Sequence, residues 1–107
     1  MKRTSPVIDP ETLRPAAAEA VGALKLLANA DRMLLLCQLS QGEMCVSELE
    51  VQLDIRQPTL SQQLGVLRAE GVVGTRRQGK NIFYSVADPN LLQILALLHR
   101  LYCPKEK

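Results

Sequence analysis

Apolar residues recur at helical spacing along the first third of the chain. From Glu11 they return every three or four residues as far as Leu27, which predicts an amphipathic helix. Asn29 is a residue type that ends one helix and caps the next. A second helix is predicted over 30–40. Its apolar run over 33–37 covers most sides, which indicates that this helix is the buried one.

A capping pattern marks a short helix in the middle of the chain. The string Ser47-Glu48-Leu49-Glu50 fits a capping box, in which the serine and glutamate satisfy free backbone N–H groups. Val46 and Val51 fit the hydrophobic staple that accompanies such a box. We therefore predict a short helix that ends near Leu53.

A second short helix follows after a four-residue turn over 54–57. Pro58 stands where a first helical residue belongs, because its missing N–H would be unpaired there. The helix is predicted over 58–70, and its apolar stripe consists of Leu60, Leu64 and Leu67.

The pattern then changes to strands. Residues 72–77 and 81–86 are predicted as two strands joined by a turn over 78–80. Asp88-Pro89 caps and opens a last helix that reaches about Tyr102. The predicted fold class is mainly α, a winged helix-turn-helix in the order helix, helix, helix, helix, strand, strand, helix.

Composition narrows the class of protein. The chain has 107 residues, the size of one domain, and 47% of them are apolar. We expect no membrane segment and a cytoplasmic location, because no apolar run is long enough to span a bilayer and the N-terminus lacks a signal-peptide pattern. Three cysteines in such a chain argue against a disulfide framework. One histidine and no Gly-rich phosphate loop argue against an enzyme, and no cofactor is predicted.

Basic residues concentrate in the second half of the chain. Residues 1–54 carry five basic and eight acidic groups, whereas residues 55–107 carry eight basic and three acidic groups. Between Arg56 and Lys80, Glu70 is the only acid. This asymmetry predicts a face that binds a polyanion, although a solvated basic surface would have the same composition.

The outward face of the helix over 58–70 suits base recognition. Opposite its leucine stripe lie Thr59 and Gln62, with Ser61 and Gln63 on the flanks. Such short, uncharged donors and acceptors match base edges in the major groove, which the first turns of a recognition helix enter. The alternative is an ordinary solvated face, but such a face more often carries lysine and glutamate, which the first turns of this helix lack.

The predicted hairpin carries Arg76, Arg77 and Lys80 with no acid nearby. We expect these cations to contact phosphates, which positions a protein on DNA without specifying sequence. The neutral loop Gln78-Gly79 is placed to reach a minor groove. The alternative is an exposed hairpin that its charge keeps soluble.

Several strings of this sequence match a known family. The densest match is 57–68, and the others are 26–32, 46–49, 71–73 and 83–84. In these strings the chain resembles the ArsR/SmtB family of small bacterial winged-helix repressors. The resemblance implies a homodimer that reads an inverted-repeat operator in double-stranded DNA. Together with the charge pattern, it predicts as DNA contacts Gln57, Thr59, Ser61, Gln62, Gln63, Arg68, Arg76, Arg77 and Lys80.

The same resemblance implies a dimer formed through the first and last helices. Both have long apolar faces that one small domain cannot easily cover, which independently favours a dimer. Residues 10–103 are then one domain for DNA binding and dimerisation, between a flexible N-terminal tail over 1–9 and a C-terminal tail over 104–107.

Many members of the family sense metals, but neither common metal pattern is complete here. The thiolate pattern needs a second cysteine where Cys45-Val46-Ser47 stands, and the last helix offers only Asp88 and His99. No metal site is predicted. Cys37 and Cys103 instead resemble the cysteine pair of a non-metal, thiol- and persulfide-sensing branch. That likeness implies that oxidants or reactive sulfur species join the two thiols within one subunit, by a disulfide or a longer sulfur chain, and weaken DNA binding.

Other interpretations of the cysteines stay open. Arg100 and Lys105 flank Cys103 and would raise its thiolate fraction, but Cys37 in an apolar run also fits a plain core cysteine. One alternative is a thiolate-based metal or metalloid sensor that uses Cys37, Cys45 and Cys103. Another is a DNA-binding module without an effector.

Overall fold

The computed structural model describes residues 9–103. Its elements, in chain order, are α1 (Pro10–Leu27), α2 (Ala30–Leu39), β1 (Met44–Cys45), α3 (Val46–Leu53), α4 (Thr59–Ala69), β2 (Val73–Gln78), β3 (Asn81–Val86) and α5 (Pro89–Tyr102). This order confirms the predicted winged helix-turn-helix, which is mainly helical. The predicted tails over 1–9 and 104–107 lie, apart from Asp9, outside the described residues.

The strands form one antiparallel sheet in the order β1-β3-β2. In the hairpin, Val73 pairs with Val86 and Gln78 with Asn81, so β2 lies one residue further along the chain than predicted. Gly79 turns the hairpin with a φ of 64°, a conformation that glycine adopts without steric cost. The two-residue strand β1, which pairs with β3, is too short for its alternation to be recognised in the sequence.

The start of α3 corrects the predicted capping box. The cap is Cys45, whose backbone N–H donates to Glu48 Oε1 at 3.0 Å, and Ser47 lies within the first turn. The predicted staple is also wrong, because Val51 is 81% exposed. The reason is tertiary, since Cys45 also pairs with β3 and the helix starts directly after it. Pro58 is likewise the cap of α4 rather than its first helical residue.

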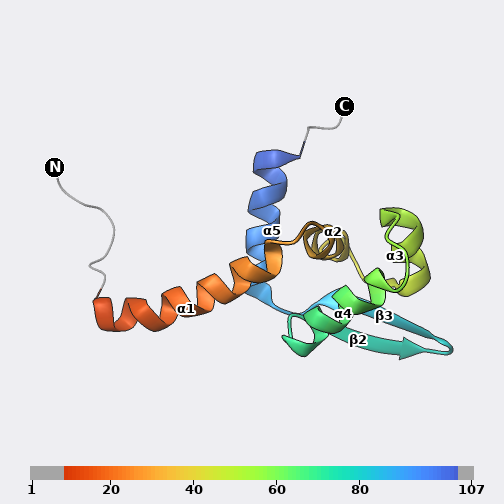
Figure 1. Ribbon diagram of the computed structural model, residues 1–107, viewed down its shortest axis with the longest axis horizontal. Coiled ribbons are helices and arrows are strands. Elements are labelled where there is room, and N and C mark those ends of the chain that lie inside the picture. Colours follow the sequence, from red (N-terminus) through yellow and green to blue (C-terminus); the bar gives the residue numbers. More distant parts are fainter. Residues whose placement is uncertain (1–8, 104–107) are drawn as a thin grey trace.

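Leucines dominate the core, and α2 supplies three that are fully buried, as its composition predicted. The buried cluster joins every helix: Leu27, Leu35, Leu36, Leu39, Leu49, Ile55, Leu60, Leu64, Leu67, Val72, Val73, Leu91 and Leu95. By contrast, residues 11–22 of α1 are all exposed. This helix extends away from the rest of the chain as an arm. Helix α5 lies beside the C-terminal end of α1 and runs across it (Figure 1).

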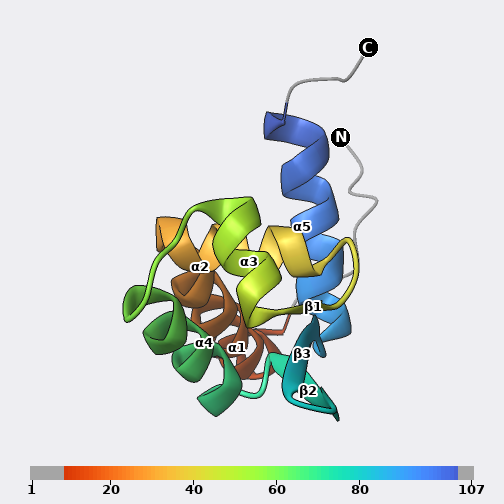
Figure 2. The ribbon, with the colours of Figure 1, turned by 90° about the vertical axis from the view of Figure 1, so that its right-hand side faces the viewer.

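Helix α4 and the β2–β3 hairpin lie on the same side of the molecule in both views (Figures 1 and 2). Helices α3 and α4 follow one another in the chain across the short turn over 54–58, and they form the helix-turn-helix pair. Helix α4, the predicted recognition helix, and the β2–β3 hairpin, the predicted wing, therefore lie on one side, whereas the end of α5 points in another direction (Figure 1). No helix among residues 9–103 is long and apolar enough to cross a lipid bilayer.

Candidate nucleic-acid interface and thiol pair

Helix α4 divides into a buried leucine stripe and a polar face. Its three leucines are at most 2% exposed and anchor it to the core. Of the four residues predicted to face DNA, which we call the reading face (Thr59, Ser61, Gln62 and Gln63), Ser61 and Gln62 are exposed and the other two are half-buried. The position predicted for Gln62, opposite the leucine stripe, agrees with its exposure, whereas Thr59, predicted to lie opposite as well, is half-buried.

Gln57 and Ser61 bind each other at the start of this helix. Gln57 Oε1 accepts hydrogen bonds from the backbone N–H of Ser61 at 3.1 Å and from its hydroxyl at 2.6 Å. The glutamine therefore caps the first turn, because it satisfies an N–H that has no partner within the helix. Its own amide NH₂ stays available at the end of α4 that a recognition helix presents to DNA.

The side chain of Gln63 is bound by Arg32, a residue that the sequence pattern did not place at the site. Arg32 Nη1 on α2 donates to Gln63 Oε1 at 3.1 Å, across 31 positions of sequence. The same guanidinium donates to the carbonyl of Leu26 at 2.9 Å and to that of Lys25 at 3.3 Å. Arg32 thus joins the C-terminus of α1 to the recognition helix. Only its place in one of the family-like strings pointed to it.

The wing arginines differ in their surroundings. Arg76 forms an ion pair with Glu43, donates from Nη1 to Gln78 Oε1 at 2.9 Å, and lies 5.0 Å from the ring centre of Phe83. The expectation that no acid lies near the wing is therefore wrong, because the turn before β1 brings Glu43 beside it. Hydrogen bonding to Arg76 lowers the pKa of Glu43, as it does for a carboxylate that accepts from a guanidinium.

The remaining predicted cations of the interface are exposed: Arg68, Arg77 and Lys80. Among residues 9–103 the Arg76–Glu43 contact is the only ion pair, so these three cations are free to meet an external anion. The basic character that the sequence predicted for this face thus rests on these residues rather than on Arg76.

Cys37 and Cys103 line one cavity. We call it the thiol cavity, and it has a volume of about 270 Å³ with a lining of Met33, Cys37, Leu98, His99, Tyr102 and Cys103. Cys37 is half-buried on α2, and Cys103 is exposed at the end of α5. Burial raises the pKa of the Cys37 thiol, and the neighbouring Cys103 raises it further. Both cysteines are free thiols in this structure, and Lys105 lies outside the described residues.

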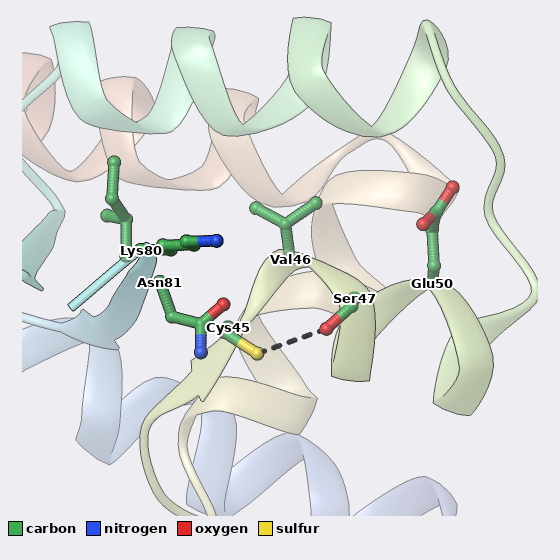
Figure 3. Close-up of a pocket in the computed structure, with 7 residues that line it drawn as sticks. Cys45, Val46, Ser47, Glu50, Lys80 and Asn81 are labelled. Atoms are coloured by element: carbon green, nitrogen blue, oxygen red, sulfur yellow. Dashed lines mark hydrogen bonds between the residues drawn. The ribbon is translucent and has the colours of Figure 1, made fainter. Parts of the chain in front are cut away.

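Cys45 lies in a different cavity, of about 330 Å³, between the start of α3 and the wing. Its Sγ is 3.3 Å from Ser47 Oγ, with Lys80 and Asn81 on one side of the cavity and Glu50 on the other (Figure 3). The three cysteines therefore do not converge within one chain. Over residues 9–103 no group of three or more His, Cys, Asp or Glu side chains is placed to hold a metal ion.

Comparison with known proteins fits this architecture. A family model described as "Bacterial regulatory protein, arsR family" matches residues 29–75. The chain is 50% identical over 91 residues to the biofilm growth-associated repressor of Agrobacterium fabrum. The aligned region covers 85% of this chain and 78% of that protein. The chain belongs to the ArsR family.

Two solved ArsR-family structures extend the match to the fold. The crystal structure of the repressor BigR from Xylella fastidiosa has a TM-score of 0.83 and 43% identity, and covers 92% of this chain and all of that one. Reduced HlyU from Vibrio cholerae has a TM-score of 0.84 and 38% identity, and covers 88% of this chain and 99% of the other. The resemblance to the non-metal branch of the family is thereby confirmed.

Members of the ArsR family are transcription regulators that bind DNA through a helix-turn-helix and typically form dimers. This chain is accordingly a DNA-binding transcription regulator and not an enzyme. Its recognition helix, wing and thiol cavity are the parts from which a more specific function can be argued.

Proposed function

We propose that the chain is a repressor that binds an inverted-repeat operator as a dimer and releases it when Cys37 and Cys103 become linked. The observation that carries the proposal is the thiol cavity, which brings together two cysteines 66 positions apart in the sequence. The relatives support it, because they include repressors and a regulator whose reduced form was solved separately.

DNA binding uses the reading face and the free cations. In the major groove, the polar side chains of α4 contact base edges, since amide and hydroxyl groups match their donors and acceptors. Beside it, Arg77 and Lys80 of the wing contact phosphates, which fixes the position of the helix in the groove. Gln57 and Arg68 flank the reading face at the two ends of α4 and contact the backbone there.

Dimerisation uses the apolar faces of α1 and α5. Leu13, Val21 and Leu24 on α1 are 46–55% exposed, and Leu97 and Leu101 on α5 are 44% and 63% exposed. A second copy would cover these side chains and remove their apolar surface from water. Each Å² of apolar surface that is buried stabilises the dimer by about 25 cal/mol. A two-fold dimer places two copies of α4 about one turn of DNA apart, so its operator is an inverted repeat.

The two thiols have different tasks in the linking reaction. Cys103 is exposed and meets the reagent first, whereas Cys37 is half-buried with a raised pKa and attacks second. With hydrogen peroxide, the two thiols lose two electrons and two protons to form a disulfide, and the peroxide becomes two water molecules. With glutathione persulfide, Cys103 accepts one sulfur atom first and releases glutathione, and Cys37 then does the same. The terminal sulfur of the Cys37 persulfide attacks the inner sulfur of the Cys103 persulfide and releases hydrogen sulfide, which leaves a trisulfide.

The link acts on DNA binding through α2 and α5. It ties α2 to the end of α5, one of the two helices proposed to form the dimer interface. Since α2 also packs against α4, a shift of α2 against α5 changes the spacing of the two recognition helices. An operator with fixed half-site spacing, of about 34 Å or a multiple, then fits less well.

The test combines intact mass with DNA affinity. A duplex selected by the reduced protein from a random pool serves as the operator, and the protein is treated with glutathione persulfide or hydrogen peroxide. We expect a Cys37–Cys103 disulfide or trisulfide, identified by mass, together with a large loss of affinity that a reductant reverses. Formation of the link with unchanged affinity, or loss of affinity without a link, would contradict the proposal.

Three single variants make the test specific. Cys37→Ser and Cys103→Ser should bind the operator normally and no longer respond. The matched control is Cys45→Ser, which changes a thiol in the other cavity and should respond like the original protein. A response that survives in either Cys37→Ser or Cys103→Ser would overturn the assignment of the pair.

A further inference from the structure

Arg32 is the one side chain in the described structure that donates hydrogen bonds to both α1 and the recognition helix. Its Nε and Nη2 hold the last carbonyls of α1, and its Nη1 holds Gln63 Oε1 at 3.1 Å. The start of α2 is fixed as well, because the side chain of Asn29 accepts from the backbone N–H of Arg32 at 3.0 Å. The guanidinium is therefore a fixed group rather than a mobile surface cation.

The chemistry of the guanidinium determines how Gln63 is oriented. Arginine has five N–H donors and no acceptor, so only the amide oxygen of a glutamine can bind it. With that oxygen held by Arg32, the NH₂ group of Gln63 points away from the guanidinium. We propose that Arg32 fixes the orientation of the Gln63 amide, so that Gln63 acts as a hydrogen-bond donor in the major groove. This inference rests on the proposed entry of α4 into that groove.

The consequence is a restricted choice of bases at one position of the operator. A free glutamine pairs with adenine through both its oxygen and its nitrogen. Gln63 already uses one of the two lone pairs of its oxygen for Arg32 and presents its NH₂ group, so we expect it to favour an acceptor such as guanine O6 or N7 or thymine O4 over adenine. Its neighbour Gln62 is exposed, and no described residue binds its side chain. The two adjacent residues Gln62 and Gln63 thus have different recognition properties, although both are glutamines.

The variant Gln63→Glu tests this orientation directly. A carboxylate also accepts from Arg32, and its second oxygen would face the groove as an acceptor. Selection of sites from a random duplex pool should therefore show a change at the base pair that Gln63 contacts, from acceptor edges to cytosine, whose N4 is a donor. We expect about a tenfold change in relative affinity between the two bases. If Gln63 presented its oxygen instead, the variant would keep the original base preference, and the inference would be overturned.

Gln62→Glu is the matched control, since it adds the same charge one residue earlier on the same helix. It should weaken binding by repulsion from phosphates without changing the preference at the Gln63 base pair. Arg32→Gln is the complementary variant, because it removes the fixed donors and lets the Gln63 amide turn. That variant should gain preference for adenine, provided that its thermal unfolding shows a folded protein. If it does not fold, Gln63→Glu still decides the question.

A failure of this inference is distinguishable from a failure of the proposed function. If Gln62→Ala and Gln63→Ala both leave the selected sites unchanged, the two glutamines do not read bases, and the proposed base reading by them falls together with the role of Arg32. If Gln62→Ala changes the selected sites but Gln63→Glu does not change the preference at the base pair that Gln63 contacts, base reading by α4 stands. The role of Arg32 is then refuted.

Discussion

Arg76 and Arg77 are adjacent on β2, and we predict that only Arg77 contributes strongly to the salt dependence of DNA binding. Successive side chains of a strand point to opposite faces. Arg76 is held by Glu43, Gln78 and the ring of Phe83, whereas Arg77 is exposed and no described residue pairs with it. A cation that is already paired with a carboxylate displaces few counterions from DNA.

The expected size follows from counterion release. Each phosphate contact contributes about 0.9 to the slope of log affinity against log salt concentration. A dimer has one Arg77 per subunit, so Arg77→Ala should flatten the slope by about 1.8. Between about 50 and 200 mM salt, the loss in affinity for the original protein should then exceed that for the variant by about twelvefold. Arg76→Ala should change the slope by well under the 1.8 expected for Arg77→Ala in the dimer.

Fluorescence anisotropy with a labelled operator, at several potassium chloride concentrations, measures both slopes. Glu43→Gln is the informative control, since it removes the carboxylate and leaves Arg76 free to reach a phosphate. That variant should have a steeper slope than the original protein. Equal flattening by Arg76→Ala and Arg77→Ala, or no steepening in Glu43→Gln, would refute the argument that Glu43 withdraws Arg76 from DNA.

Three further predictions concern stability and thiol reactivity. Leu60→Ala, which truncates a side chain with no exposed surface, should lower the free energy of unfolding by about 2–5 kcal/mol in urea titrations. A loss below about 1 kcal/mol would mean that the site collapses around the smaller residue. Asp88→Ala removes an acceptor for two backbone N–H groups at the start of α5 and should cost about 0.5–2 kcal/mol, measured in the same way. Because the pKa of Cys37 is raised, its alkylation by iodoacetamide should accelerate only above the pH range of an ordinary thiol, and Cys103→Ser should move that acceleration to lower pH. Peptide mass spectrometry would show a pH profile unaffected by Cys103→Ser if the two thiols were independent.

Local sequence patterns were sufficient for most of the elements. The apolar spacing predicted α1, α2, α4 and α5 to within one or two residues, because helical periodicity depends on residues only three or four positions apart. The same reasoning placed the leucines of α4 inside and Ser61 and Gln62 outside, while Thr59 and Gln63 are half-buried. At α3 the predicted end near Leu53 is confirmed, but the start was misplaced, because the helix begins at Val46 directly after β1, which pairs with β3. That pairing joins residues about forty positions apart and leaves no local signal.

The residue types of the site were visible in the sequence, but their partners were not. Composition and spacing indicated a polar recognition helix and a basic wing, and the family resemblance pointed to the pair of Cys37 and Cys103. Packing decided that Glu43 holds Arg76, that Arg32 holds Gln63, and that two cysteines share a cavity while Cys45 lies elsewhere. These contacts join positions more than thirty residues apart, whereas sequence periodicity extends over only a few turns of a helix. The sequence by itself therefore determined which chemical groups the surface carries. The tertiary structure decided which of them are free to act, because a hydrogen bond or ion pair within the protein occupies a group that would otherwise meet DNA.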